Sequence, residues 1–348
     1  MLLLLYWFGM SMYAFVLFGV DKKRATGDRR RRIPERKLIA VTVLGGAVGS
    51  GLAMLLFWHK VRKKKFTVTV PIALAVTLLL AGICFYQNLH ITVSEYEYAG
   101  ANVPAELDGF RIVQVSDLHN QFYGAKEQLL IDRISELRPD IIVVTGDVID
   151  KYHTNYRLAL RFFEGAVKIA PVYYVTGNHE DWLSGERLTR FLSDIEALGV
   201  VLMDDKKVTL GALTLIGIAD CNLANPGEEL KADKHASDGP ASDGPASDSG
   251  FTICLAHEPE YHSRYLRLGA DITFSGHIHG GQIIIPGKGG FVSPDFSFFP
   301  ELYGGEYTFR EGAQSMTMYI SRGLGNSILP LRINNYPELV VVTLRCPQ

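Results

Sequence analysis

The ten residues FRIVQVSDLH, at positions 110–119, contain the pattern from which the fold of this chain can be predicted. The first six are rich in β-branched residues and nearly uniformly apolar, which is typical of a strand buried on both faces. The polar residues Asp117 and His119 follow directly. They stand two positions apart, so an extended chain would place both side chains on the same side.

The same pattern, a buried strand that ends in polar residues, recurs four times further along the chain. Apolar positions at helical spacing occur within 125–138 and 184–198. This order predicts an α/β domain with a sheet-on-sheet centre in residues 107–348. The later strands are 141–145 before GDVID, 172–176 before GNHE, 252–256 before HEP and 272–275 before GHIHGGQ, and strands without following helices are expected at 213–219, 316–321 and 339–344.

Seven potential metal ligands fall in these polar clusters. Ligand sites in α/β sheets lie beyond the carboxyl ends of the strands, so we expect the clusters to meet in one crevice. Seven oxygen and nitrogen donors are too many for one tetrahedral ion and suit two ions that share a carboxylate. Mixed imidazole and carboxylate donors favour Mn, Fe or Zn, and no Cys is present to form a thiolate zinc site. The predicted ligands are Asp117, His119, Asp147, Asn178, His257, His277 and His279.

In this order the clusters resemble the motif set of the calcineurin-like metallophosphoesterases, and the end of the chain looks like their membrane-associated bacterial branch. The resemblance extends over about residues 107–345. With the strand pattern, it implies a four-layer α/β/β/α sandwich. It also implies hydrolysis of a phosphate mono-, di- or pyrophosphoester by attack of metal-bound hydroxide. The matching motifs are Asp117-x-His119, Gly146-Asp147-x-x-Asp150, Gly177-Asn178-His179-Glu180, His257 and Gly276-His277-x-His279.

The resemblance assigns a role to each predicted site residue. Asp147 would bridge the two metals, His179 would protonate the leaving oxygen or neutralise transition-state charge, and Asp150 would orient a ligand. A metal-binding sensor or scaffold without turnover is the alternative, and the presence of His179 as a proton donor outside the ligand set favours the enzyme. The other ligands would divide into Asp117, His119 and His279 at one metal and Asn178, His257 and His277 at the second.

The first 90 residues differ in composition from the rest. They carry 14 Lys and Arg against three acids, whereas the remaining 258 residues carry 21 against 34. An acidic body of that size would repel a phosphate backbone, which argues against a nucleic-acid partner. The uncharged stretches 2–20, 38–58 and 66–89 are each about as long as the roughly 20 helical residues that cross a bilayer. We therefore expect residues 1–90 to form a multi-pass anchor in the cell membrane.

Two basic loops give conflicting indications of the orientation of this anchor. The loop 21–37 contains nine Lys and Arg and the loop 59–65 contains five, and each is expected to stay in the cytoplasm. Three full spans would separate the loops and leave the acidic domain in the cytoplasm. If 38–58 instead breaks at Gly45-Gly46 and re-enters, both loops stay inside and the acidic domain lies on the extracytoplasmic side. We favour the second arrangement.

The N-terminal third also resembles a small bacterial integral-membrane family of uncharacterised function, over about residues 6–86. FGVDKK at 18–23, RIPER at 32–36 and LGG at 44–46 carry this resemblance. It implies a membrane anchor with lipids as partners and little chemistry. Together with the anchor, the aromatic stretch from Phe291 to Tyr303 favours a lipid-linked or envelope-associated phosphate ester as substrate.

The sequence also indicates the structure or role of the remaining segments. Residues 91–106 are expected to leave the membrane as an alternating strand and then a Pro-containing linker. Residues 231–250 repeat ASDGP, which predicts a flexible surface insertion. Arg322 and Arg332 are candidates for binding substrate phosphate or for surface ion pairs. Nothing in the sequence predicts an oligomeric state.

Overall fold

A computed structural model describes residues 2–27, 32–183, 185–220, 231–232, 250–326 and 332–347. The chain forms two compact units, an N-terminal unit of Met1–Asn88 and a larger unit that begins at Leu89. The insertion predicted at 231–250 lies outside the described residues, apart from 231–232 and Gly250.

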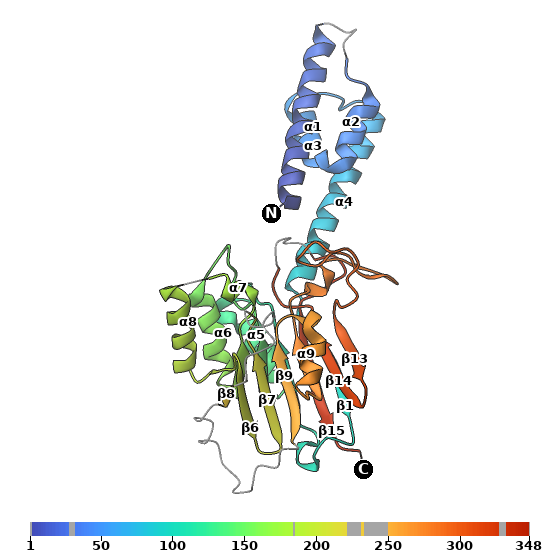
Figure 1. Ribbon diagram of the computed structural model, residues 1–348. Coiled ribbons are helices and arrows are strands. Elements are labelled where there is room, and N and C mark those ends of the chain that lie inside the picture. The colour runs from blue at the N-terminus through green and yellow to red at the C-terminus, as the bar shows by residue number, and fades with distance from the viewer. Residues whose placement is uncertain are drawn as a thin grey trace. The chain divides into compact units, whose positions relative to one another are not determined.

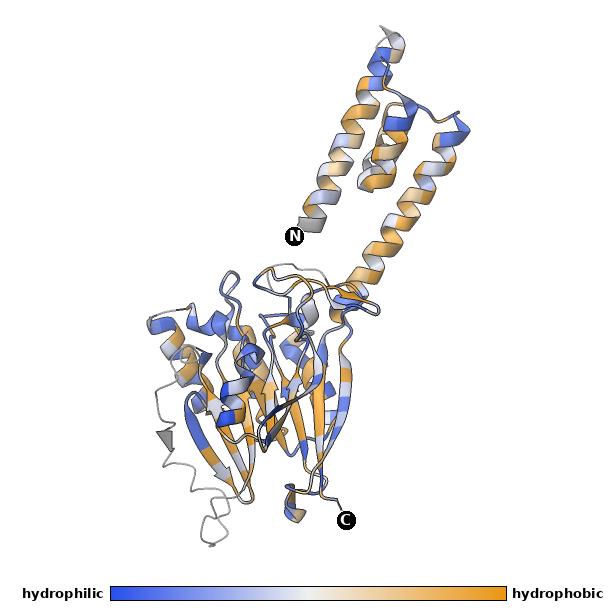
Figure 2. Cartoon of the chain, turned by 45° about the vertical axis from the view of Figure 1, so that its right-hand side comes forward, coloured by the Kyte–Doolittle hydropathy of each residue, from blue (hydrophilic) through white to orange (hydrophobic). Residues whose placement is uncertain are grey.

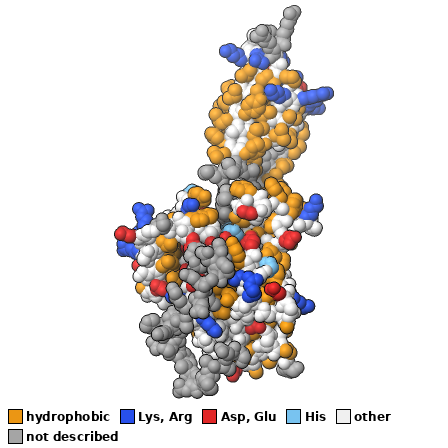
Figure 3. Space-filling model, in the orientation of Figure 1, with side chains coloured by type: hydrophobic (Ala, Val, Ile, Leu, Met, Phe, Trp, Pro, Cys, Tyr) orange, Lys and Arg blue, Asp and Glu red, His pale blue; other side chains and the backbone are white. Residues whose placement is uncertain are grey.

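The described part of the N-terminal unit is helical, and most residues of these helices are hydrophobic (Figure 2). Lys and Arg gather near one end of it (Figure 3). If each is counted as one continuous helix, Glu35–Leu56 and Lys64–Leu89 are long and apolar enough to cross a membrane, by length and composition. The helices are α1 (Leu2–Thr26), α2 (Glu35–Val41), the π-helical η2 (Thr42–Gly46), α3 (Ala47–Leu56) and α4 (Lys64–Leu89) (Figure 1).

The second apolar stretch folds back on itself at the glycine pair where the sequence predicted a break. Gly45 has φ 111°, which a glycine adopts without steric cost, and it interrupts the helix. The hydroxyl oxygens of Thr42 and Ser50 lie 2.7 Å apart, whereas eight residues of straight helix would separate them by about 12 Å. The stretch is therefore a helical hairpin made of α2 and α3.

The two basic loops lie side by side within this unit. The buried carboxylate of Asp21, near the end of α1, accepts a hydrogen bond from Arg32 at 3.2 Å. The same carboxylate lies 2.8 Å from the ring of His59 and 3.3 Å from the ammonium group of Lys60. Lys60 also pairs with Glu35 at 3.0 Å. The loops 21–37 and 59–65 thus share one network of ion pairs.

Two mixed β-sheets form the centre of the larger unit. The strand order is β1-β15-β2-β3-β4-β5 in the first sheet and β13-β14-β10-β9-β7-β6-β8 in the second. Every strand predicted from the sequence is present. The bounds are β1 (Thr92–Ala99), β2 (Arg111–Val115), β3 (Ile141–Thr145), β4 (Val172–Val175), β5 (Val201–Leu202), β6 (Lys206–Leu210), β7 (Leu213–Ile218), β8 (Lys231–Ala232), β9 (Phe251–Ala256), β10 (Ile272–Ser275), β13 (Gly305–Glu311), β14 (Gln314–Ile320) and β15 (Glu338–Arg345), with a separate pair β11 (Ile284–Ile285) and β12 (Gly289–Gly290).

Buried apolar side chains hold these elements in four layers, as the sequence predicted. Residues such as Ile112, Val143 and Phe274 are packed between the two sheets. Three helices cover the outer face of the first sheet, and α9 covers the second (Figure 1). The order helix, sheet, sheet, helix confirms the α/β/β/α sandwich. The helices are α5 (Gln128–Glu136), α6 (Tyr156–Ala166), α8 (Glu186–Ala197) and α9 (His262–Arg267), with short turns α7 (Asn178–Asp181), η3 (Ala105–Leu107), η4 (Ala125–Glu127), η7 (Pro259–Tyr261) and η8 (His279–Gly281).

The alternating stretch that was expected to lead into a linker belongs to the first sheet. β1 pairs in parallel with β15, with Thr92 opposite Glu338. Because β15 is antiparallel to β2, the start of β1 lies at the end of the sheet where β2 finishes. Only His90 and Ile91 separate the end of α4 from β1.

Candidate functional site

All nine residues predicted for the site come together beyond the carboxyl ends of five strands. Eight of them are buried, and His277 is half-buried. Each residue follows the strand that the sequence assigned to it. Asp117 and His119 follow β2, Asp147 and Asp150 follow β3, Asn178 and His179 follow β4, His257 follows β9, and His277 and His279 follow β10.

Five of the seven predicted ligands have a left-handed backbone, which side chains other than glycine rarely adopt. The conformation costs about 1–2 kcal/mol per residue, and such strain persists where the surrounding structure imposes it. Here the turns are held by backbone hydrogen bonds, from Asp117 to Gly146 at 3.1 Å and from His119 to Asp147 at 2.9 Å. The φ values are 51° at Asp117, 45° at His119, 53° at Asp147, 71° at His277 and 51° at His279.

One group of donors forms around Asp117, His119 and His279. The Nε2 atoms of the two histidines lie 3.0 Å apart. Nε2 of His279 is 3.4 Å from Oδ1 of Asp117, and Nε2 of His119 is 3.4 Å from Oδ2 of Asp147. Ser116 fixes the other oxygen of Asp117 by donating a hydrogen bond of 2.6 Å. The first predicted ligand set is therefore assembled, with Asp147 at its border.

A second group lies on the other side of Asp147. Nε2 of His257 is 3.3 Å from Oδ2 of Asp147 and 3.0 Å from Oδ1 of Asn178. Nδ1 of His277 lies 3.1 Å from the same Asn178 oxygen. One oxygen of Asp147 thus faces both groups, as a bridging carboxylate would.

The donor set fits two divalent cations. Imidazole nitrogens that point at one another carry converging lone pairs, and a shared cation turns that repulsion into attraction. Nδ1 of His257 lies 2.8 Å from the carbonyl oxygen of Thr145, and an N–H there leaves the lone pair on Nε2, which faces the site. Three buried or half-buried groups of His and Asp are close enough to hold metal ions.

Asp150 and His179 lie beside the ligands and contact each other. Oδ2 of Asp150 is 3.5 Å from Nδ1 of His119 and 3.7 Å from Nδ1 of His179, and Oδ1 accepts hydrogen bonds from the backbone of Tyr152 and His153 at 2.7 Å each. Burial raises the pKa of Asp150, but the hydrogen bonds from His119 and the backbone outweigh it and lower the value to about 2. Asp150 therefore stays ionised and orients His119.

Hydrogen bonds with Lys151 and Asp147 hold His179 in its orientation. Its Nδ1 accepts a hydrogen bond of 3.1 Å from the backbone of Lys151, which places the proton of the neutral ring on Nε2. The backbone N–H of His179 donates a hydrogen bond of 2.8 Å to Oδ1 of Asp147. Burial lowers the pKa of His179 to about 4. The ring also lies close enough to His119 and Asp147 for all three to share an ion, so the geometry is compatible with a proton donor and with a ligand.

Glu180 has a structural role behind the predicted ligands. Its buried side chain accepts backbone hydrogen bonds from Asp147 at 2.8 Å and from Ile149 and Gly177 at 2.9 Å. Burial, together with the charge of Asp147, raises the pKa of this carboxyl to about 8. Glu180 thereby ties the turn after β3 to the turn after β4.

Neither arginine suggested for phosphate binding is free to do so. Arg332 is buried and donates hydrogen bonds to the carbonyl oxygens of Arg322, at 2.9 Å, and of Gly325. Arg322 pairs with Glu338 at 2.6 Å. Both arginines hold the segment after β14 in place. Arg332 therefore fits neither of its two predicted roles, which were a contact with substrate phosphate and a surface ion pair.

Two side chains missed by the sequence prediction border His179. The ring of Trp182 is 4.9 Å from that of His179, and Nζ of Lys151 lies 4.5 Å above the Trp182 ring. Trp182 is 49% exposed, so a cation and an aromatic surface stand at the edge of the site. Lys151 lies one residue after Asp150 and Trp182 lies three residues after His179, and this closeness in sequence is the signal that could have identified them.

Comparison with known proteins agrees with this geometry. A family model described as Calcineurin-like phosphoesterase matches residues 110–281. A model described as a protein of unknown function, DUF1294, matches residues 11–66.

Individual relatives extend the likeness. The uncharacterized metallophosphoesterase YkuE of Bacillus subtilis (strain 168) is 31% identical over 304 residues, which cover 82% of this chain and 98% of the relative. A transmembrane protein with metallophosphoesterase domain from Danio rerio is 26% identical over 264 residues, covering 73% of this chain and 57% of the relative. Among solved structures, a dimetal phosphatase from Danio rerio is 14% identical, with a TM-score of 0.36, and covers 62% of this chain and 88% of its own.

Proposed function

We propose, on the premise that this chain belongs to the calcineurin-like metallophosphoesterases, that it is a membrane-anchored phosphoesterase. It would hydrolyse a phosphate mono-, di- or pyrophosphoester with two divalent transition-metal ions, Mn, Fe or Zn. The observation that carries the proposal is the position of Asp147, with one carboxylate oxygen facing His119 on one side and His257 on the other.

The residues of this chain would divide the work. Asp117, His119 and His279 would hold one cation and Asn178, His257 and His277 the second. The bound cations would supply charge for the phosphate oxygens and an activated water as nucleophile. His179, with its proton on Nε2, would donate a hydrogen bond towards the leaving oxygen and offset the charge that develops there, while the backbone N–H of Lys151 keeps its ring in place.

Substitution of the bridging residue tests this function. Asp147→Asn removes the charge between the two groups, so we expect Mn²⁺-stimulated hydrolysis of bis(p-nitrophenyl) phosphate to fall to the level of the uncatalysed reaction. Asp132→Asn, an exposed aspartate on α5, is the matched control and should retain activity. Activity of Asp147→Asn equal to that of the control would refute the proposed role.

The hairpin of the N-terminal unit supports an extracytoplasmic catalytic unit. At about 1.5 Å per residue, the seven residues of α2 and the ten of α3 reach about 10 and 15 Å, short of a bilayer core of about 30 Å. The basic loops on either side of this hairpin share the Asp21 network. We infer that the hairpin re-enters, that both loops lie in the cytoplasm, and that α4 carries the chain outward.

The connection between α4 and β1 favours a substrate that is located at the membrane. The start of β1 lies at the metal-site end of the sheet, and two residues separate it from α4. At this end Phe291 donates a backbone hydrogen bond to Gly281, the last residue of η8, and begins the aromatic stretch. Phe296 and Phe298 of that stretch are 60% and 65% exposed. These features support a lipid-linked phosphate ester as substrate and membrane lipids as partners.

A further inference from the structure

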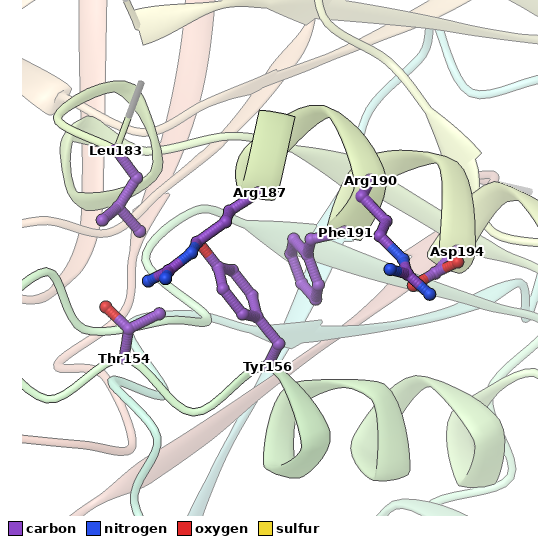
Figure 4. A pocket seen from close by; sticks show the side chains of 7 residues that line it. All are labelled: Thr154, Tyr156, Leu183, Arg187, Arg190, Phe191 and Asp194. Atoms are coloured by element: carbon purple, nitrogen blue, oxygen red, sulfur yellow. The ribbon is translucent and has the colours of Figure 1, made fainter. Parts of the chain in front are cut away.

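A pocket of about 600 Å³ lies between the start of α6 and α8 (Figure 4). None of the predicted site residues lines it. Its walls combine two arginines, two aromatic rings and a single acid, and its residues are Thr154, Tyr156, Leu183, Arg187, Arg190, Phe191 and Asp194.

Two short stretches of chain connect the pocket to the predicted metal site. Thr154 lies four residues after Asp150, and its hydroxyl donates a hydrogen bond of 2.8 Å to the Asp150 carbonyl. Leu183 lies four residues after His179, in the turn that ends α7. Four residues of fully extended chain span at most about 14 Å, so the nearer wall of the pocket lies within that distance of Asp150 and His179.

Arg187 and Arg190 give the pocket its chemistry. They stand three residues apart, on one face of the first turns of α8, where the helix dipole also favours an anion. Among the described residues, no ion pair or hydrogen bond joins either guanidinium group to another side chain. Figure 4 shows the Arg187 guanidinium between Leu183 and Thr154, whereas Arg190 points towards Asp194.

The floor of the pocket is aromatic and rigid. The ring of Phe191 is buried and packs against Tyr156, with ring centroids 5.2 Å apart and planes inclined by 37°. Asn155, just before Tyr156, caps α6 by accepting a hydrogen bond from Leu158. Both arginines are exposed, and a guanidinium group above such a floor can bind a phosphate with two parallel N–H donors.

We propose that this pocket binds a second phosphate group of the substrate, carried on the arm that extends away from the ester phosphate at the metals. Arg187 is the principal contact and Arg190 the secondary one. The inference rests on the proposed phosphoesterase function and adds the substrate class, a phosphate ester that bears a further phosphate. Arg187 and Arg190 here determine specificity and have no part in bond cleavage.

The test uses the full-length protein in detergent with Mn²⁺ and two p-nitrophenyl diesters. One is p-nitrophenyl hexyl phosphate, and the other carries a terminal phosphate on the hexyl chain. We expect the wild type to prefer the second by about tenfold or more in kcat/KM. Arg187→Gln should abolish most of that preference through KM and leave hydrolysis of the first diester unchanged. Arg157→Gln, an exposed arginine on α6 outside the pocket, is the matched control.

The outcomes separate this inference from the proposed function. Hydrolysis of both diesters with equal kcat/KM by the wild type would overturn the pocket assignment while the phosphoesterase function stands. The pocket assignment would also be overturned if Arg157→Gln lost as much of the preference for the diester with a terminal phosphate as Arg187→Gln. Absence of Mn²⁺-dependent hydrolysis of both diesters would refute phosphodiester hydrolysis by this chain and, with it, the pocket assignment.

Discussion

His179 is the residue whose role the geometry leaves divided between proton donor and metal ligand. Its Nδ1 is occupied by the Lys151 backbone, which leaves an N–H on Nε2 to donate a hydrogen bond to the leaving oxygen. We predict that His179→Ala lowers kcat by about 10² to 10³, the range typical of a lost donor to transition-state charge, while the metal content stays unchanged. Rate and bound metal are measured on the same preparation.

A second histidine, on the loop between β3 and α6, provides the control. His153 is 85% exposed in its side chain and lies near Asp150, so His153→Ala should change neither the rate nor the metal content. Loss of a metal ion from His179→Ala would instead identify His179 as a ligand.

At the residue scale the sequence predicted which side chains meet, because each follows a buried strand whose end is visible as a change from apolar to polar. It did not predict their orientation. The left-handed turns at residues such as Asp117 and His279 depend on hydrogen bonds between neighbouring turns, which local sequence does not encode. Arg332 shows the same limit, because its burial depends on carbonyl groups of Arg322 and Gly325 that only the fold brings to it.

At the element scale, the turn after β3 depends on a glycine. Gly146 has φ 84°, and a Cβ there would lie 2.5 Å from Nδ1 of His257 and 2.8 Å from Cα of Gly177. We predict that Gly146→Ala costs about 3 kcal/mol or more in unfolding free energy, since clash adds to about 1–2 kcal/mol of backbone strain. It should also weaken metal binding by displacing His257. Denaturant unfolding and metal titration measure both effects.

The matched control is a glycine that has the strain without the clash. Gly211, between β6 and β7, has φ 60°, and a Cβ added there would meet no atom within 4 Å. Gly211→Ala should therefore cost only about 1–2 kcal/mol and leave metal binding unchanged. Equal losses in the two variants would show that crowding at His257 is unimportant.

The strands were the most predictable elements and the pairings between distant strands the least. β2, β3, β4, β9 and β10 each stand out as a short apolar run, whereas α6 was missed despite its amphipathic face. Nothing local indicates that β15 inserts between β1 and β2, because that order brings together residues about 240 positions apart. The strand expected at the start of 91–106 is present, but its pairing with β15 was not predicted.

For the whole molecule, the fold of the N-terminal unit predicts the side of the membrane on which catalysis occurs. An alkaline phosphatase reporter fused after Gln348 should be active, and a green fluorescent protein at the same point should be dark, because the first matures outside the cytoplasm and the second inside. Reporters inserted after Thr26, in the first basic loop, should give the opposite pair of results. A fluorescent fusion after Gln348 would contradict the re-entrant hairpin.

The central claim is that Asp147 holds two cations together, and the number of bound metal ions tests it most directly. Full-length wild type, Asp147→Asn and the control Asp132→Asn are purified in the same detergent with Mn²⁺, and metal per chain is measured by mass spectrometry. The account predicts close to two ions in the wild type and in Asp132→Asn, and at most one in Asp147→Asn. A wild type without bound metal, or an Asp147→Asn variant that retains two ions, would contradict it.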